Sequence, residues 1–346
     1  MKKSIVALAV LGAFAGAASA QSSVTVYGLL DMSVAKGNGG TASNPGALGT
    51  SKAWTVQQSA GSRLGFRGNE DLGGGLSAQF QIEHRFNPDT GTQTNAAPAA
   101  NTTPPSSNPG IFWQGRSYVQ LTSAAVGSIY LGRDYSPAFW PAVKSDPFGW
   151  DGVGQIGSQA YAGYLTPDAV SLGGGVRTSN TVGVKTASFG GLTVQAAVGL
   201  SETSGVGRTD GFNVEYAGGP LYAALGYEKV DAGTFNGRGV INLALHYDFG
   251  FAKVLGYYAA AKVGLNGTVK NKMFSVGLTA PIGPGKLKAA YLSVDPQGAN
   301  NNNSKIGLGY DYALSKRTNL YADLGMGKAD ARTNNTAYAF GVKHTF

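Results

Sequence analysis

The 346-residue sequence contains no cysteine, only three histidines and little charge. Without cysteine the chain can form neither disulfides nor thiolate metal sites. Charged residues account for 13% of the chain, about half the share that is usual in soluble domains. Such a chain is unusual for a secreted enzyme but ordinary for a protein with a lipid-facing surface.

No long apolar run follows residue 20, because a glycine or a charged residue interrupts every candidate. A spanning α-helix needs ~20 apolar residues, so none is predicted in this part of the chain. If the protein lies in a membrane, it must therefore cross it with strands. Lipid supplies no hydrogen-bond partners for the backbone, so only a closed β-barrel would serve.

Glycine and basic residues are present in excess. The 53 glycines are far above the usual share of about 7% and favour many tight turns. The 27 Lys and Arg exceed the 19 Asp and Glu, for a formal net charge of +8. These charges are scattered singly and form no basic tail, so nucleic acid is not an expected partner.

The amino terminus predicts export. Lys2 and Lys3 precede an apolar run over residues 5–17, and Ala-Ser-Ala at residues 18–20 matches a signal-peptide cleavage site. The run is too short for a membrane-spanning anchor, which is the weaker interpretation. We therefore expect a cleaved signal peptide over residues 1–20 and a single transmembrane β-barrel domain over residues 21–346.

The carboxyl end alternates between two faces up to its last residue. Tyr338, Phe340 and Phe346 share one face of a strand with Val342 and His344. Soluble domains usually end in frayed polar residues. A chain that ends within a two-faced strand indicates a closed sheet, in which the last strand is expected to pair with the first.

Period-two alternation recurs along the whole chain and predicts strands throughout. Seven short turns alternate with eight long polar loops, which predicts a sixteen-stranded antiparallel barrel, to within two strands. Short turns at one end and long loops at the other are typical of outer-membrane barrels. The predicted turns are at residues 69–75, 123–127, 189–191, 218–220, 248–250, 281–285 and 313–317, and the predicted loops are at about 36–60, 87–111, 134–174, 201–209, 230–236, 263–267, 295–303 and 328–335.

Two of the loops stand out. Residues 87–111 are rich in Ala, Thr, Asn and Pro and show no pattern, which indicates an exposed surface loop. Residues 134–174 carry seven aromatic residues, which should not all face water. Either this loop packs on the outer rim, or it folds into the lumen and narrows it; we favour the second interpretation.

Strand parity places the charged side chains on one face. An Arg at the lipid midplane costs ~2–4 kcal/mol, so this face should line a wet interior and the apolar face should meet lipid. Snorkelling from the rims is the alternative, and it explains single residues better than the whole set. The charged face carries Arg63, Arg67, Glu83, Arg116, Arg177, Lys185, Lys286, Lys288 and Lys305.

These charges predict a pore that prefers anions. A sixteen-stranded barrel leaves an aqueous channel, and charges across a constriction bias the passage of ions. The wall carries an excess of Arg and Lys. A third loop folded into the lumen would supply the acids Asp146 and Asp151, and Lys144 would add positive charge. No nucleotide or metal cofactor is expected.

Several short stretches carry a family resemblance. They are Val-Thr-Val-Tyr-Gly at residues 24–28, Ser-Arg-Leu-Gly-Phe-Arg-Gly at 62–68 with Glu-Asp-Leu-Gly at 70–73, Gly-Ser-Ile-Tyr-Leu-Gly-Arg at 127–133, Asp-Pro-Phe-Gly at 146–149, and the terminal Phe346. By their order and spacing over essentially the whole chain, the sequence resembles the general porins of the Gram-negative outer membrane, of the sixteen-stranded trimeric kind from beta-proteobacteria.

The resemblance implies a passive diffusion channel for small hydrophilic solutes. It also implies a homotrimer in outer-membrane lipid and lipopolysaccharide, with a third loop folded into each barrel. The barrel-assembly machinery would recognise the terminal strand through Tyr338, Phe340 and Phe346.

The resemblance also suggests site residues. Arg63 and Arg116 fall at positions of constriction-wall arginines, Arg177 matches an arginine after the third loop, and Asp146 lies near the acidic tip of that loop. Leu29 replaces a basic residue of some relatives, and no Arg lies between Arg133 and Arg177, so only a mild anion preference is expected. Arg133 has the parity of lipid-facing residues and would reach the lumen only if a bulge or the start of the third loop turns it.

Three other functions are less well supported by the sequence. A barrel hydrolase needs a nucleophile and a base together, but His84, His246 and His344 have no obvious Ser or Asp partner in the sequence. A non-conducting structural or adhesive outer-membrane barrel would depend on residues 87–111. A soluble all-β domain would place its apolar face inside, which is the reverse of the order predicted here.

Overall fold

The computed structural model describes residues 22–42, 51–93, 112–157, 161, 176–201, 208–231, 236–296 and 302–346. The predicted signal peptide lies outside these residues. Among them are eighteen strands, of which sixteen are 7–15 residues long, one α-helix and one 3-10 helix. Their bounds are β1 Ser23–Gly37, β2 Thr55–Gln57, β3 Arg63–Gly73, β4 Leu76–Asn87, β5 Thr92–Gln93, β6 Ser117–Ser123, β7 Gly127–Tyr135, α2 Phe139–Lys144, β8 Arg177–Thr186, β9 Leu192–Gly199, β10 Arg208–Gly218, β11 Leu221–Asp231, β12 Gly239–Asp248, β13 Lys253–Val263, η4 Leu265–Gly267, β14 Val269–Ile282, β15 Gly285–Pro296, β16 Asn303–Ala313, β17 Thr318–Ala329 and β18 Asn335–Thr345.

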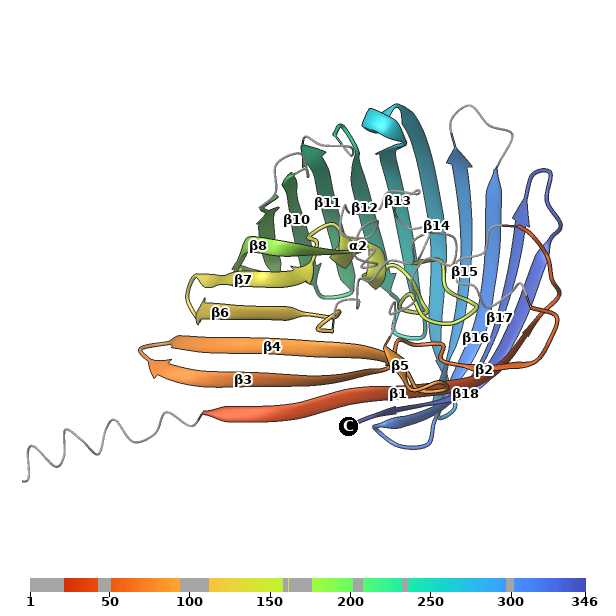
Figure 1. Cartoon of the computed structure of the whole chain (residues 1–346), viewed down its shortest axis with the longest axis horizontal. Coiled ribbons are helices and arrows are strands. Elements are labelled where there is room, and N and C mark those ends of the chain that lie inside the picture. The colour runs from red at the N-terminus through yellow and green to blue at the C-terminus, as the bar shows by residue number, and fades with distance from the viewer. Residues whose placement is uncertain are drawn as a thin grey trace, which may run out of the picture.

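The sixteen long strands form one closed antiparallel barrel (Figure 1). Each long strand pairs with the next one along the chain, and β1 pairs with both β3 and β18. The short strand β2 adds to β1, and β5 adds to β4. The predicted sixteen-stranded barrel is confirmed.

The two ends of the chain close the barrel. In the register of β1 and β18, Leu29 lies opposite Thr345. Gly28 N donates to Phe346 O at 3.1 Å, and Phe346 N donates to Gly28 O at 3.2 Å. The pairing expected from the alternating carboxyl end is therefore present up to its last residue.

The predicted turns and loops agree with the strand bounds. Tight connections join the strands at one end of the barrel; for example, Gly218 pairs with Leu221, and Ile282 with Gly285. The long loops lie at the other end, and two of them contain the short strands β2 and β5. Of the loop at 87–111, only residues up to 93 are described.

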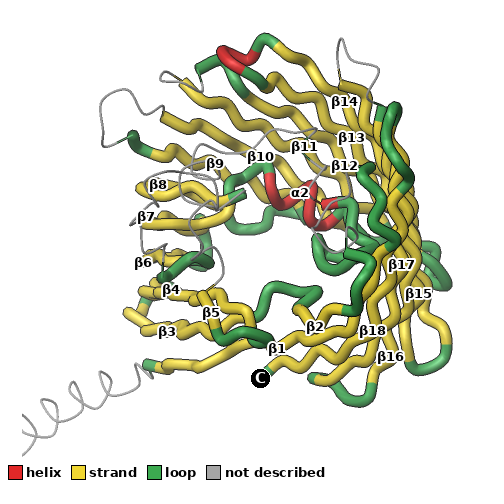
Figure 2. The backbone as a smooth tube through the Cα atoms, turned by 45° about the vertical axis from the view of Figure 1, so that its right-hand side comes forward, coloured by secondary structure: helices red, strands yellow, loops and turns green. Residues whose placement is uncertain are grey.

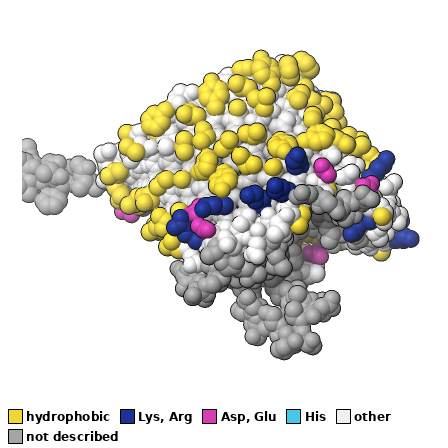
Figure 3. Space-filling view, turned by 90° about the horizontal axis from the view of Figure 1, so that it is seen from above, with side chains coloured by type: hydrophobic (Ala, Val, Ile, Leu, Met, Phe, Trp, Pro, Cys, Tyr) yellow, Lys and Arg dark blue, Asp and Glu magenta, His cyan; other side chains and the backbone are white. Residues whose placement is uncertain are grey.

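The outer face of the barrel is apolar and the inner face is polar. Val24, Leu245 and Phe340 are 68%, 60% and 55% exposed. Figure 3 shows hydrophobic side chains spread across the outer surface. The inward residues Lys305 and Asn242 are 2% and 0% exposed. This order confirms the predicted parity and is the reverse of a soluble barrel.

Helices contribute little to the architecture. Within the described ranges, none is long and apolar enough to cross a membrane. The helix α2 contacts β10, β11 and β12 and lies within the ring of strands in Figure 2. The strands therefore set the shape of the protein.

The contact between Gly28 and the Phe346 ring gives a test of closure. A Cβ at residue 28 would collide with that ring and lie 2.7 Å from the Arg63 carbonyl oxygen. We expect Gly28→Leu to destabilise the barrel by about 1–3 kcal/mol, the usual cost of overpacking. The measurement is the temperature at which the folded band is lost in heat-modifiability gels. Ala322→Leu, at an exposed position on β17, is the control and should leave that temperature unchanged.

Candidate functional site

Four strands bring five arginines onto one part of the inward face. Arg63 and Arg67 lie on β3, and Arg85 on β4 is directly opposite Arg63. Arg116 directly precedes β6, which pairs with β4, and Arg177 begins β8. We call this set the arginine wall; its members are Arg63, Arg67, Arg85, Arg116 and Arg177.

Tyr135, the last residue of β7, joins two members of the arginine wall. Its hydroxyl oxygen accepts hydrogen bonds from Arg85 Nη2 at 3.2 Å and from Arg177 Nη2 at 2.5 Å. The Arg177 guanidinium also lies 4.2 Å from the centre of the Tyr135 ring, where the electron-rich face attracts a cation. Tyr135 thus holds two like charges at a fixed spacing.

Two carboxylates orient the other guanidinium groups. Arg85 Nε donates to Glu83 Oε1 at 2.7 Å. Arg116 binds Asp134 with two hydrogen bonds, at 2.6 Å and 2.7 Å, a geometry that fixes the plane of the guanidinium. The five arginines of the wall thus outnumber the two carboxylates that bind Arg85 and Arg116.

The segment after β7, residues 136–157, contacts the polar face of distant strands; we call it the third-loop segment. Asn213 Nδ2 donates to the Pro137 carbonyl oxygen at 2.8 Å, and Asn242 Nδ2 donates to that of Ala138 at 2.8 Å. Further along, Lys305 Nζ donates to the Gln155 carbonyl oxygen at 2.5 Å. Inward polar side chains of β10, β12 and β16 therefore satisfy backbone carbonyls of this segment.

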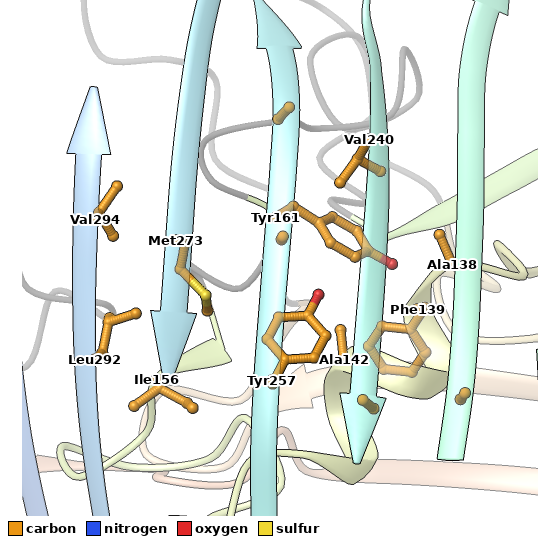
Figure 4. Packing of buried hydrophobic residues seen from close by; sticks show 14 of the residues in the cluster. Ala138, Phe139, Ala142, Ile156, Tyr161, Val240, Tyr257, Met273, Leu292 and Val294 are labelled. Carbon is orange, nitrogen blue, oxygen red and sulfur yellow. The ribbon is translucent and has the colours of Figure 1, made fainter. Parts of the chain in front are cut away.

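An apolar cluster holds the same segment on the barrel wall (Figure 4). Phe139 and Ala142 of α2 and Ile156 pack with Tyr257 and Met273, which come from β13 and β14. All five side chains are buried. Of the seven aromatic residues predicted to avoid water, Phe139, Phe148 and Tyr161 are buried in this cluster. Tyr135, Trp140 and Trp150 pack against it and are partly buried, and Tyr164 lies outside the described residues.

The end of α2 is fastened to β10 and β12. Ser145 Oγ lies 2.8 Å from His246 Nε2, and Lys144 forms an ion pair with Glu215. Lys144 is therefore paired, whereas the sequence predicted that it would add positive charge.

His246 has a serine partner, which the sequence did not reveal. The pair is poorly placed for catalysis. Ser145 and His246 are each 1% exposed, so a substrate could not reach them, and Ser145 Oγ donates its hydrogen bond to the Pro141 carbonyl oxygen at 2.7 Å. No group of three His, Cys, Asp or Glu placed to hold a metal occurs in the described part of the chain.

Asp146 organises the third-loop segment. Its carboxylate accepts hydrogen bonds from the backbone N–H groups of Phe148 at 2.9 Å, Trp150 at 3.1 Å and Ile156 at 3.1 Å. Burial raises the pKa of Asp146 to about 6, although these N–H groups and Lys305 act in the opposite direction. The carboxylate therefore serves largely to hold the backbone of the segment.

Asp151 lines a polar cavity of about 310 Å³ between the third-loop segment and the barrel wall, together with Asp31 and Lys343. Burial raises the pKa of Asp151 to about 6; Lys343 and Arg63 lower it, and Asp31 raises it. The Asp151 carboxyl group therefore lies close enough to Lys343 and Arg63 for their positive charges to act on it.

Further along the cavity wall, Lys288 binds two acids. Its Nζ lies 2.6 Å from Asp311 Oδ1 and 3.1 Å from Asp323 Oδ1. This lysine is therefore neutralised by its neighbours, unlike the excess cations of the arginine wall.

The remaining predicted arginines are placed as follows. Arg67 lies 5.4 Å from the centre of the Tyr27 ring. The bulge that Arg133 required is present between Gly132 and Asp134. The Arg133 guanidinium donates to the Gln114 carbonyl oxygen at 3.3 Å and to Ser179 Oγ at 2.9 Å.

Arg85 was not predicted as a site residue, although the sequence carries a signal for it. Arg85 follows Glu83 by two residues and so continues the inward face of β4. Tyr135 and Asp134 were missed because their role depends on which arginines they meet across strands. The terminal aromatics lie on the outer face, where Phe340 and Phe346 are 55% and 42% exposed.

Comparison with known proteins agrees with this geometry. The chain matches the family model described as Gram-negative porin over residues 7–332. It is 34% identical to outer membrane porin protein 32 of Delftia acidovorans and 29% identical to an outer membrane porin protein of Bordetella pertussis, with 100% of each chain covered in both cases. Among solved structures it resembles the anion-selective porin from Comamonas acidovorans, with a TM-score of 0.77 and 28% identity over 94% of this chain and 100% of that one.

These matches span nearly the whole barrel and point to a channel rather than an enzyme. They agree with the closed sixteen-stranded sheet, its apolar outer face and its charged inner face. The chain therefore belongs to the Gram-negative porin family and acts as an outer-membrane porin channel.

Proposed function

We propose that this porin lets small hydrophilic solutes diffuse passively through a water-filled lumen that mildly prefers anions. The observation that carries the proposal is the excess of positive charge on the arginine wall. Charges that line a low-dielectric channel act on passing ions more strongly than charges on an open surface. The similarity to the anion-selective porin from Comamonas acidovorans supports the same interpretation.

The proposal includes a third loop folded into the lumen. Support comes from the inward residues Asn213, Asn242 and Lys305, which donate to backbone carbonyls of the third-loop segment. An aqueous channel narrowed by this segment on one side would leave the arginine wall on the other. Ions would then pass close to the guanidinium groups.

In this scheme the charged residues have distinct roles. Arg63, Arg67, Arg116 and Arg177 form the basic side of the constriction, together with Arg85. Asp151 is the opposing acid of the third loop. Asp146 acts on the loop backbone, and the pairing of Lys144 with Glu215 and of Arg133 with Gln114 and Ser179 gives those two cations a smaller part.

The proposal extends to assembly. By analogy with the family, the long loops face the cell exterior and three copies form a trimer. A signal peptide directs export, and the barrel-assembly machinery reads Tyr338, Phe340 and Phe346 on the last strand. Lipid and lipopolysaccharide cover the apolar outer face.

Charge reversal on the arginine wall tests ion selectivity. A unit charge about 10 Å from an ion in water contributes ~0.4 kcal/mol. Arg63→Glu changes the charge by two, so it should lower anion entry about fourfold and raise cation entry about fourfold. The anion-to-cation permeability ratio should therefore fall about sixteenfold. Reversal potentials in planar bilayers under a KCl gradient measure this ratio. Arg116→Glu should act in the same direction but also destabilise the barrel, because Asp134 loses both hydrogen bonds.

The matched control is Lys328→Glu, which makes the same change of charge on the exposed outer face of β17. It should leave the reversal potential unchanged. If Arg63→Glu and Arg116→Glu also leave it unchanged while conductance persists, the constriction assignment is wrong. A folded parent protein without conductance would instead favour the structural or adhesive barrel.

Because the pKa of Asp151 is raised, we expect the ion selectivity of the channel to depend on pH. Its pKa of about 6 means that the carboxylate is charged at pH 7.5 and becomes neutral as the pH falls to 5. Loss of this negative charge leaves the nearby cations less opposed, so anion preference should rise as the pH falls. Asp151→Asn should raise the permeability ratio about fourfold at pH 7.5, because one charge at ~10 Å changes anion and cation entry about twofold each in opposite directions. It should also flatten the change of this ratio between pH 7.5 and pH 5. Equal pH profiles for the two proteins would contradict this role.

A further inference from the structure

Residues 151–154 of the third-loop segment, which we call the loop tip, lie against the seam where β1 meets β18. There the Val153 side chain is buried in a small apolar cluster with three alanines of these two strands, Ala35, Ala337 and Ala339. Val34 and Phe340, the sequence neighbours of Ala35 and Ala339, are exposed on the outer face. The alanines therefore face inward, and Val153 packs on the inner side of the seam.

Two glycines let the backbone of the loop tip lie directly on the next two strands. Gly307 of β16 and Gly325 of β17 are directly opposite each other in the register. A Cβ at Gly325 would collide with the Val153 carbonyl oxygen, and a Cβ at Gly307 would collide with that of Gly154. Any larger residue at these two positions would push the loop tip off the sheet.

A hydrogen bond joins the loop tip to the segment between β2 and β3. Gly152 N donates to the Ser59 carbonyl oxygen at 3.1 Å. Ser59 is held in turn by Asp31 of β1, whose Oδ1 accepts from Ser59 N at 2.8 Å and from the Tyr321 hydroxyl of β17 at 2.7 Å. The acceptor of the Gly152 hydrogen bond is thus fixed to strands on both sides of the seam.

These contacts also place Asp151, which directly precedes Gly152. Charged groups on four strands act on the Asp151 carboxyl group: Lys343 of β18, Arg63 of β3, Arg85 of β4 and Asp31 of β1. The interaction between two charges weakens as their separation grows. A loop tip that left the seam would take the carboxylate away from these groups, and it would then oppose their positive charge less.

We propose that the contacts of Gly152 and Val153 with Ser59 and the seam form a latch that positions Asp151, and so sets the ion selectivity of the channel. We call these contacts the seam latch; Gly152 and Val153 are positioning residues. The strand pair that closes the barrel thereby also fixes the acid that opposes the arginine wall. The inference rests on the proposed function, in which the third loop lies in the lumen and charged residues govern which ions pass.

A disulfide tests the geometry of the seam latch. A Cβ at Gly152 would lie 3.5 Å from Ser59 Cβ, and the two Cβ atoms of a disulfide are about 3.5–4.5 Å apart. The chain has no cysteine, so the variant Ser59→Cys, Gly152→Cys carries the only two thiols. In the folded protein these thiols should cross-link under mild oxidation, measured as loss of maleimide labelling that dithiothreitol restores.

The matched control is Ser59→Cys, Gly149→Cys. Gly149 lies three residues earlier and has a φ of 66°, close to the 70° of Gly152, so both variants place a cysteine in the same unfavourable backbone conformation. A Cβ at Gly149 has no atom within 4 Å. The control should therefore keep both thiols open to maleimide.

Releasing the loop tip tests its role in selectivity. Val153→Asn places an amide among the three alanines, and Gly325→Ala displaces the tip through one methyl group. In planar bilayers at pH 7.5, each should raise the anion-to-cation permeability ratio toward the roughly fourfold increase expected for Asp151→Asn. Each should also flatten the pH profile of this ratio, and neither should add to the effect of Asp151→Asn. Disulfide formation by the Ser59→Cys, Gly152→Cys pair in the Val153→Asn protein should restore the parent ratio, and reduction should abolish the rescue.

Two outcomes would overturn the seam latch. One is equal maleimide labelling of the Gly152→Cys pair and its Gly149→Cys control after oxidation. The other is a lower temperature of unfolding in Val153→Asn and Gly325→Ala with an unchanged pH profile, which would leave the loop tip a purely structural role. A folded channel without any ion preference would refute the proposed function instead, and the cross-linking yield would still report separately on the latch.

Discussion

The structure depends on one constraint, which is that a sheet in lipid must leave no unpaired edge. The strand β1 meets this constraint by pairing with two strands, β3 and β18. Residues 23–29 of β1 pair with β3, and residues 29–37 pair with β18. Backbone hydrogen bonds between Gly28 and Phe346 complete the seam at the last residue of the chain.

Closure also decides where charge can lie. With one face of every strand turned to lipid, the polar residues of a charge-poor sequence collect inside, where they need partners. Glu83 and Asp134 orient Arg85 and Arg116, and Tyr135 holds Arg85 and Arg177 together. These contacts fix the guanidinium groups without neutralising all of them. Other inward polar residues, Asn213, Asn242 and Lys305, bind the third-loop segment, so the proposed constriction combines two sets of inward side chains.

Local patterns predicted the fold well, because strand parity and turn positions are encoded by adjacent residues. Parity assigned Arg63, Arg67, Arg116 and Arg177 to the charged face, and it would have assigned Arg85 as well had the pattern been followed two residues further. The side-chain contacts of these residues could not be predicted from strand parity. The contact of Ser145 with His246 joins residues 101 positions apart, and the pairing of Lys144 with Glu215 joins residues 71 apart. Such contacts depend on where a long loop packs against distant strands. The orientation of the Arg133 side chain likewise depends on a β-bulge, which an alternating sequence pattern alone does not encode.

The most direct test of the account is the reversal potential of the unmodified porin in a planar bilayer at pH 7.5 under a dilute KCl gradient. The excess charge of the arginine wall predicts stepwise conductance with an anion-sided reversal potential. That preference should fade when both solutions are near 1 M, where the Debye length falls to ~3 Å from ~10 Å at 0.1 M. A cation-sided or zero reversal potential at low salt would contradict the claim that the arginine wall governs which ions pass.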